Sequence, residues 1–275
     1  MSVRRSFRML PEGPLLILAV ALVGAVCIPL WQSTVASEQS VSLFTSERLG
    51  RLLLGPEQIA CYAAFTWAGF ILASRHLELR RQRRSFGLEL LPVEEDARIL
   101  PEDARLWQRR INRLSSGSAP YLLSQLLEAA LGKFAITRSA QEAGDVIQAQ
   151  TDVELGRLAN SMATVNYLAW AIPAIGFVGT VRGIGMALSV APGMSAASWQ
   201  QFLDQTTKSL AVAFDATLVA LLLSLVLMFL LHAQQRGEED LVLDCQQYCL
   251  DHLQGRLYHL MQPAVLPPVE FLGQE

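Results

Sequence analysis

The chain has 275 residues, of which 52% are hydrophobic and 17% are charged, and its formal net charge at pH 7 is −3. Soluble domains carry about 25% charged residues, so this composition indicates an integral membrane protein. The slightly negative charge, without a basic face bearing aromatic side chains, argues against nucleic acid as a partner. The sequence has no phosphate-binding loop, nucleophile elbow or histidine-rich metal pattern, so we expect neither an enzyme nor a bound metal or cofactor.

The first apolar run, residues 15–31, follows a basic start that contains Arg4, Arg5 and Arg8. One interpretation is a cleaved export signal, because such signals combine a basic start with an apolar core, and the paired arginines resemble a twin-arginine signal. The other is a retained membrane helix with its basic end in the cytoplasm. The run is longer than a typical signal core and lacks a good small-x-small cleavage site, so we favour retention.

A second apolar run, residues 59–74, is short and rich in alanine and glycine, which suits close contact between membrane helices. Five arginines follow it directly, from Arg75 to Arg84. Because cytoplasmic ends of membrane helices are enriched in Lys and Arg, this cluster places the end of the run in the cytoplasm. Residues 1–84 are therefore predicted to form a membrane hairpin of two spans.

Residues 85–160 are predicted to be a cytoplasmic helical region. Pro101 can open a helix that extends through Arg113, and apolar residues recur at helical spacing from Leu122 to Phe134. The pattern then continues into the third apolar segment, which predicts a cytoplasmic helix that becomes a membrane helix without a break. The charges of this region fit either a solvated face or a docking surface for a cytoplasmic partner.

Two further apolar segments, residues 163–190 and 210–232, are each long enough to cross a hydrocarbon layer of about 30 Å as a helix. We assign them to a core of two spans at 161–235, followed by a cytoplasmic helical tail at 236–275. The predicted fold is therefore all-α and polytopic, with four spans, long cytoplasmic helical extensions and both termini in the cytoplasm.

Several groups in the last two spans are ones that lipid disfavours. Thr180 and Thr217 lie at matching depths near mid-membrane, and Arg182 and Asp215 also lie at comparable depths. Opposite charges at one depth on antiparallel helices predict a buried ion pair, within one subunit or between two. The alternative for each threonine is a hydrogen bond back to its own helix. Small residues are expected to bring a neighbouring helix close on one face: Gly176, Gly179 and Gly183.

Two stretches of these spans carry a resemblance to a known family. The run from Ile172 to Ile184 reads IPAIGFVGTVRGI and resembles the P-x-x-G-x-x-G-T-V-x-G segment of the MotA/TolQ/ExbB proton-channel family. The run AFDATLVA, from Ala213 to Ala220, is similar to the alanine- and threonine-rich segment of that family's last span. The order and spacing of both motifs agree with the family.

The resemblance implies a homopentamer in the bacterial inner membrane around the single-span helices of a MotB/TolR/ExbD-like dimer, which carries the proton-accepting aspartate. Thr180 and Thr217 would be pore-lining hydroxyls near that carboxylate, and Pro173 matches a family proline that lets the third span bend. Asp215 would brace a subunit contact or would itself titrate on the proton path. The implied function is coupling of the proton motive force to mechanical work.

Four spans with two cytoplasmic termini are similar to the topology of MotA, whereas the motif sequences are closer to those of TolQ and ExbB. A flagellar-type stator is therefore the nearest alternative function. A passive membrane scaffold with no ion conduction is an alternative of another class, and a solute transporter is a weaker one because no internal repeat is evident. We expect the ion to be H⁺ rather than Na⁺, since the resemblance favours the proton-driven branch.

Overall fold

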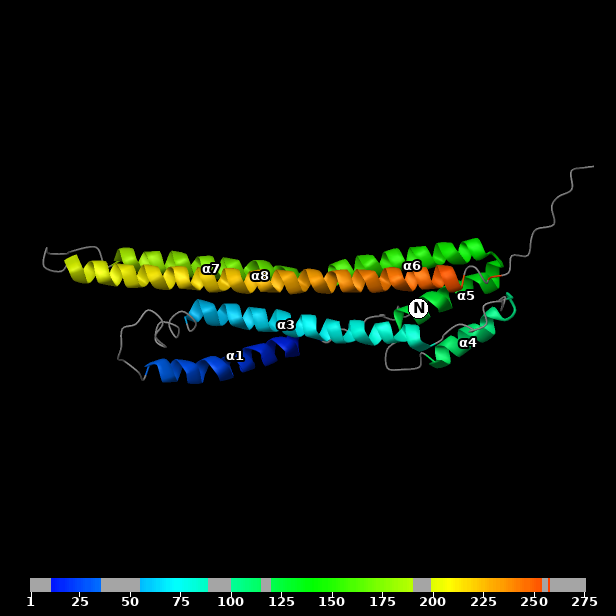
Figure 1. Ribbon diagram of the computed structural model, residues 1–275, viewed down its shortest axis with the longest axis horizontal. Coiled ribbons are helices and arrows are strands. Elements are labelled where there is room, and N and C mark those ends of the chain that lie inside the picture. The colour runs from blue at the N-terminus through cyan, green and yellow to red at the C-terminus, as the bar shows by residue number, and fades with distance from the viewer. Residues whose placement is uncertain are drawn as a thin grey trace, which may run out of the picture. The chain divides into compact units, whose positions relative to one another are not determined.

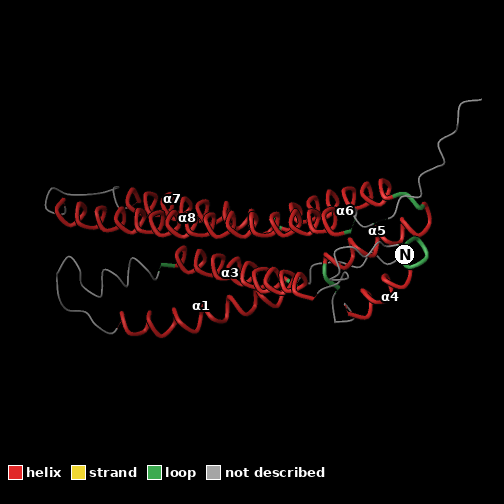
Figure 2. Tube along the Cα trace, turned by 45° about the vertical axis from the view of Figure 1, so that its right-hand side comes forward, coloured by secondary structure: helices red, strands yellow, loops and turns green. Residues whose placement is uncertain are grey.

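The computed structural model describes residues 11–35, 55–88, 100–114, 120–189, 199–253 and 257. Within these ranges the chain is almost entirely helical and has no β-strand, so the predicted all-α class is confirmed there (Figures 1 and 2). The elements in chain order are α1 (Glu12–Val35), α3 (Pro56–Arg83), the 3₁₀ turn η1 (Arg84–Leu88), α4 (Ala104–Leu114), α5 (Leu122–Thr137), α6 (Ala140–Ser161), α7 (Ala163–Ser189) and α8 (Trp199–His252).

The chain divides into two compact units. The bundle unit comprises Met9–Leu79 and Arg157–Glu238, and the α4–α5 unit comprises Met1–Arg8, Arg80–Gly156 and Glu239–Glu275. The bundle unit thus joins most of the predicted N-terminal hairpin to the predicted two-span core. The sequence-based division at residues 84, 160 and 235 stays a prediction.

Three helical stretches in the described part of the chain are long and apolar enough to cross a membrane: Glu12–Pro29, Ala140–Ser189 and Phe202–His252. They cover nearly all of the predicted first span (15–31) and third span (163–190), and the whole of the predicted fourth span (210–232). The predicted second span, residues 59–74, lies in α3, which is not among them. The count of four spans therefore stays a prediction.

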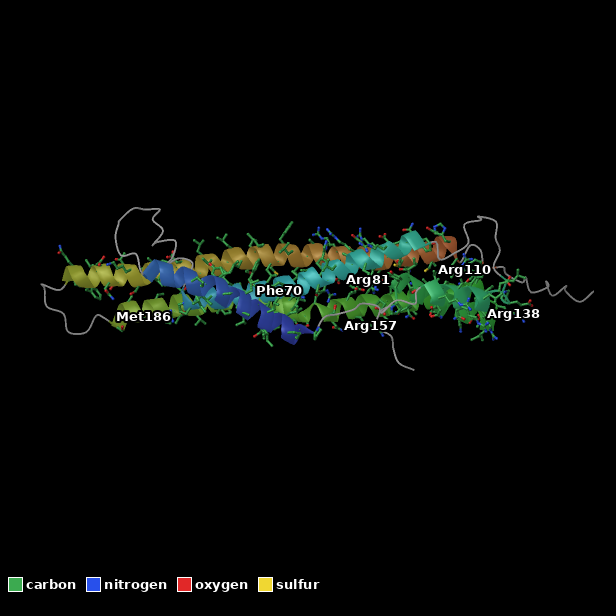
Figure 3. All side chains as sticks on the ribbon, turned by 90° about the horizontal axis from the view of Figure 1, so that it is seen from below. Phe70, Arg81, Arg110, Arg138, Arg157 and Met186 are labelled. Atoms are coloured by element: carbon green, nitrogen blue, oxygen red, sulfur yellow. The ribbon has the colours of Figure 1, made fainter. Side chains whose placement is uncertain are left out.

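The core of the bundle unit is made where α3, α7 and α8 meet. Its buried members are Cys61, Ala68, Ile71 and Leu72 of α3, Met162 of the preceding turn, Val165, Leu168, Ala169 and Ile172 of α7, and Ala220, Leu227 and Leu231 of α8. α1 joins α3 through a hydrogen bond from the Trp67 indole nitrogen to the Glu12 carbonyl (3.2 Å). Large apolar side chains also cover the outside, among them Trp170 (76% exposed), Phe229 (73%) and Met186, which is labelled in Figure 3. Such an apolar exterior suits a hydrocarbon environment.

The α6–α7 junction corrects one prediction. The two helices are not one unbroken helix, because Met162 forms a turn between Ser161 and Ala163. The turn is stabilised from α3, where Arg75 Nη1 donates a hydrogen bond to the Ser161 carbonyl (3.2 Å). A long apolar pattern does not reveal a one-residue turn, since the same side chains stay on the buried face on both sides of it.

The α4–α5 unit is built around α5. Its leucines and Phe134 are buried, and α4 packs against it, with Gln108 Nε2 donating to the Glu128 carbonyl (2.9 Å). The backbone N–H of Leu122 at the start of α5 donates to Gln82 Oε1 (2.9 Å), which satisfies a helix N-terminal donor. α5 ends where Arg138, labelled in Figure 3, adopts the left-handed conformation with φ 57°.

The C-terminal part of α8 belongs to the same unit. Apolar residues at helical spacing in this part of the chain are buried: Leu241, Cys245, Cys249, Leu253 and Leu257. α8 extends to His252, and the predicted cytoplasmic tail at 236–275 stays a prediction. The remainder of the tail, apart from residues 253 and 257, lies outside the described residues, as do the basic start and the connection at 190–198.

Candidate functional site

The two threonines singled out by the sequence lie against each other in the bundle unit. Thr180 comes from α7 and Thr217 from α8, and their hydroxyl groups are hydrogen-bonded across the helix–helix contact. Both side chains are half-buried. α7 and α8 are antiparallel, so the equal depth predicted from the sequence brings the two hydroxyls to one point.

Each hydroxyl also lies close to two backbone carbonyls. Thr180 Oγ1 is 3.3 Å from the Gly176 oxygen and 3.4 Å from the Ala213 oxygen, and Thr217 Oγ1 is 3.2 Å and 3.4 Å from the same two atoms. A threonine hydroxyl has one proton to donate and two lone pairs. Two protons are therefore shared among two carbonyls and two hydroxyls, which leaves the hydroxyls able to accept a further hydrogen bond.

The threonine hydroxyls contact carbonyls of their own helix and of the neighbouring helix. The contacts of Thr180 with Gly176 and of Thr217 with Ala213 run back one turn within the same helix. The contacts of Thr180 with Ala213 and of Thr217 with Gly176 cross to the other helix. Because each hydroxyl has an acceptor on both helices, a small rotation of either hydroxyl redirects its proton without moving the backbone.

Glycines allow α7 and α8 to approach at this site. A Cβ added at Gly176 would lie 2.5 Å from Ala220 Cβ and 3.3 Å from Thr217 Cα. At Gly183 it would lie 2.5 Å from Ala213 Cβ, and at Gly179 it would lie 3.0 Å from Ala216 Cβ. Real Cβ atoms essentially never come as close as 2.5 Å to another atom, and contacts of 3.0–3.3 Å are unusually tight, so these glycines are part of the contact between the helices. Gly185 differs, since an added Cβ would have no atom within 4 Å.

Pro173 lies inside α7, one turn before this glycine face, and is half-buried. Proline has no N–H, so it leaves the carbonyl four residues earlier, that of Ala169, without its helix donor. Ser224 Oγ of α8 donates to that carbonyl at 3.1 Å. The carbonyl of Ile172, three residues after Ala169, accepts the Cys61 thiol of α3 at 3.7 Å.

Arg182 makes an ion pair that the sequence did not indicate. Its Nε is 2.9 Å from Glu57 Oε1 and its Nη2 is 3.0 Å from Glu57 Oε2, a two-pronged contact between α7 and the first turn of α3. Glu57 also packs on the helix–helix contact, with its Cγ 3.1 Å from the added Cβ at Gly179. The signal that could have found it is an acid at the start of the second predicted span, at the end opposite the arginine cluster.

Asp215, the predicted partner of Arg182, is half-buried on α8. It precedes Thr217 by two residues, so about 200° of helical rotation separates their side chains. The pairing of Asp215 with Arg182, within one chain or between two, stays a prediction, as does a place for Asp215 on an ion path.

A second charged group lies in the same unit, toward the α6–α7 turn. Arg75 of α3 and Glu238 of α8 pair through Nε–Oε1 (2.9 Å) and Nη2–Oε2 (2.6 Å), and their side chains are 6% and 1% exposed. Gln234 Nε2 donates to Glu238 Oε1 at 2.9 Å. In the sequence, Arg75 indicated only which end of the second predicted span lies in the cytoplasm. The structure shows that Arg75 also joins α3, α8 and the α6–α7 turn.

Comparison with known proteins shows which family the chain belongs to. The model of the MotA/TolQ/ExbB proton channel family matches residues 105–247, just over half of the chain, and this stretch includes the paired threonines and the glycine face. A search of curated proteins and a search of solved structures each returned no match. The chain therefore belongs to the MotA/TolQ/ExbB proton channel family, and its apolar helices and family membership give it the role of a membrane protein in proton conduction.

Proposed function

We propose that this chain is the channel subunit of a complex in the bacterial inner membrane that converts the proton motive force into mechanical work. In this proposal, five copies surround the single-span helices of a MotB/TolR/ExbD-like dimer. The observation that carries the proposal is the hydroxyl pair, Thr180 with Thr217, held between two apolar helices in the stretch matched by the family model.

The pair has the chemistry that a proton-carrying partner carboxyl requires. A protonated carboxyl donates one hydrogen bond, whereas the ionised form only accepts, and a threonine hydroxyl can serve both forms without being charged. Each hydroxyl also has alternative carbonyl acceptors within 3.4 Å, so it can reorient when the partner changes state. The two hydroxyls therefore exchange hydrogen bonds with the partner carboxyl as a proton passes. Because the hydroxyls are uncharged, no charge of this chain has to be desolvated at the site.

The proton motive force supplies the energy of each step. Moving one elementary charge across the membrane releases about 2.3 kcal/mol per 100 mV. Five threonine pairs cannot all engage a dimer at once, so each protonation favours a new relative orientation of ring and partner. Ion flow is thereby converted into rotation of this subunit ring around the dimer.

The proposed topology has four spans and both termini in the cytoplasm. The second span would be α3, whose buried face of Cys61, Ala68 and Leu72 packs in the same core as α7 and α8. The basic residues in the last turn of α3, Arg80, Arg81 and Arg83, support a cytoplasmic end there.

The test is proton flux through the complex reconstituted in liposomes with its partner. Thr217→Val keeps the side-chain shape and removes the hydroxyl, so we expect flux to be abolished while the subunits still assemble. Thr207→Val is the matched control, because the Thr207 hydroxyl donates to Leu203 of its own helix on an exposed part of α8. Full flux in Thr217→Val would refute the proposal.

A passive scaffold is the second candidate, and one observation favours it: each threonine hydroxyl has a carbonyl acceptor within its own helix, as a purely structural threonine does. A scaffold predicts no potential-driven flux from either the unmodified complex or the Thr217→Val variant. A flagellar-type stator would show the same flux as the proposed complex. It is distinguished by the process that the complex drives in the cell.

A further inference from the structure

The Ser224 hydroxyl makes a hydrogen bond that the fold requires because Pro173 lies inside α7. Pro173 removes the N–H that would bond to the Ala169 carbonyl, and a buried carbonyl without a donor is costly in an apolar bundle. The Ser224 hydroxyl, from the neighbouring helix, lies 3.1 Å from that oxygen. A hydrogen bond between α7 and α8 thus replaces one that the proline takes from within α7.

The replacement bond is in register with the threonine pair. Ser224 follows Thr217 by seven residues on α8, and Ala169 precedes Gly176 by seven residues on α7. Seven residues are two helical turns, or about 10.5 Å, so each pair lies on one face of its helix. Thr217 donates to the Gly176 carbonyl at 3.2 Å in the same way that Ser224 donates to Ala169. The two contacts form a ladder with two rungs between antiparallel helices.

The buried side chains of α7 are mostly large before Pro173 and small after it. Before Pro173 its buried residues include Val165, Leu168 and Ile172, whose branched side chains interlock with α3 and α8. After Pro173 they are Gly176, Gly179, Gly183 and Ala187. Small residues allow close approach but offer few side-chain atoms to resist sliding or rotation. The hydrogen-bonded rungs are therefore well placed to fix the register of the glycine half.

We propose that Ser224 is a positioning residue for the threonine site. By supplying the hydrogen bond that Pro173 removes, it holds α7 against α8 in the register in which Thr180 meets Thr217. The inference deepens the proposed function by naming a residue that sets the geometry of the same site. The geometric claim itself does not depend on proton conduction.

The test measures site geometry directly, as the rate of disulfide formation within one chain in the Thr180→Cys/Thr217→Cys variant of the full-length protein. Peptide mass identifies the cross-link. Adding Ser224→Ala should slow formation about threefold, the size of an average hydrogen bond between membrane helices. Ser224→Thr, which keeps a hydroxyl, should restore the rate. Thr207→Ala, which removes a hydroxyl bonded within its own helix, should leave the rate unchanged.

The decisive comparison is made in the Pro173→Ala background. Alanine restores the N–H that bonds to Ala169, so there Ser224→Ala should have no effect on the rate. Equal slowing with and without the proline would overturn the proposal, because Ser224 would then act through something else. No slowing in either background would overturn it as well. Since disulfide formation needs no ion flow, this outcome is independent of flux in Thr217→Val: either result can fail while the other holds.

Discussion

Replacing Gly176 by alanine should destabilise the helix pair that carries the site. The added Cβ would lie 2.5 Å from Ala220 Cβ and 3.3 Å from Thr217 Cα. Ordinary carbon–carbon contacts are about 3.5–4.0 Å, so the overlap is roughly 1 Å. Ala220 Cβ is fixed to its backbone and cannot rotate away, so α7 and α8 must separate. Overpacking of this kind costs about 1–3 kcal/mol.

Gly185 provides a matched control on the same helix. An added Cβ there has no atom within 4 Å, so Gly185→Ala should show only the greater preference of alanine for helix, a stabilisation of up to about 1 kcal/mol. Thermal unfolding of the detergent-solubilised protein compares the two variants. At about 2–4 °C per kcal/mol, Gly176→Ala should lower Tm by several degrees and Gly185→Ala should not lower it. Equal changes in the two variants would refute the argument from close packing.

Two further predictions concern the buried groups beyond the threonine site. Arg75→Ala should cost about 3–5 kcal/mol of unfolding free energy, because it leaves the Glu238 carboxylate charged, 1% exposed and without its guanidinium; replacing both residues by methionine should recover most of that loss in the same unfolding assay. Cys245 lies beyond the predicted span 210–232, and burial raises its pKa from 9.0 to about 12. The neutral thiol is therefore favoured in the folded state, so its contribution to stability is complete below pH 9 and is lost as pH rises to about 12. Cys245→Ala should accordingly reduce the loss of stability over that interval in alkaline unfolding, and an unchanged pH profile would contradict the assignment.

Apolar length and small-residue spacing were sufficient to predict most of the helices. They also predicted the meeting of Thr180 and Thr217, because antiparallel spans of known length bring equal depths together. The same arithmetic did not indicate Glu57, with which Arg182 forms an ion pair. Depth gives the position of a side chain along a helix, but the partner also depends on rotation about the helix axis and on which third helix lies nearby.

Three features were beyond prediction. The pairing of Arg75 with Glu238 joins residues 163 positions apart, and nothing local to either residue indicates it. The bond from Ser224 to the carbonyl freed by Pro173 joins two helices, and nothing local to either segment indicates which residues of α7 and α8 lie opposite each other. The α6–α7 turn at Met162 was missed because the apolar pattern runs through it unchanged.

The central claim is that the threonine pair faces a proton-carrying helix of another polypeptide. Disulfide cross-linking in native membranes tests it most directly, between the Thr217→Cys variant and a cysteine placed at the carboxyl position of the partner's single span. The account predicts a cross-link from position 217 and none from Leu225→Cys, on the exposed apolar side of α8. A cross-link from Leu225→Cys with none from position 217 would contradict it.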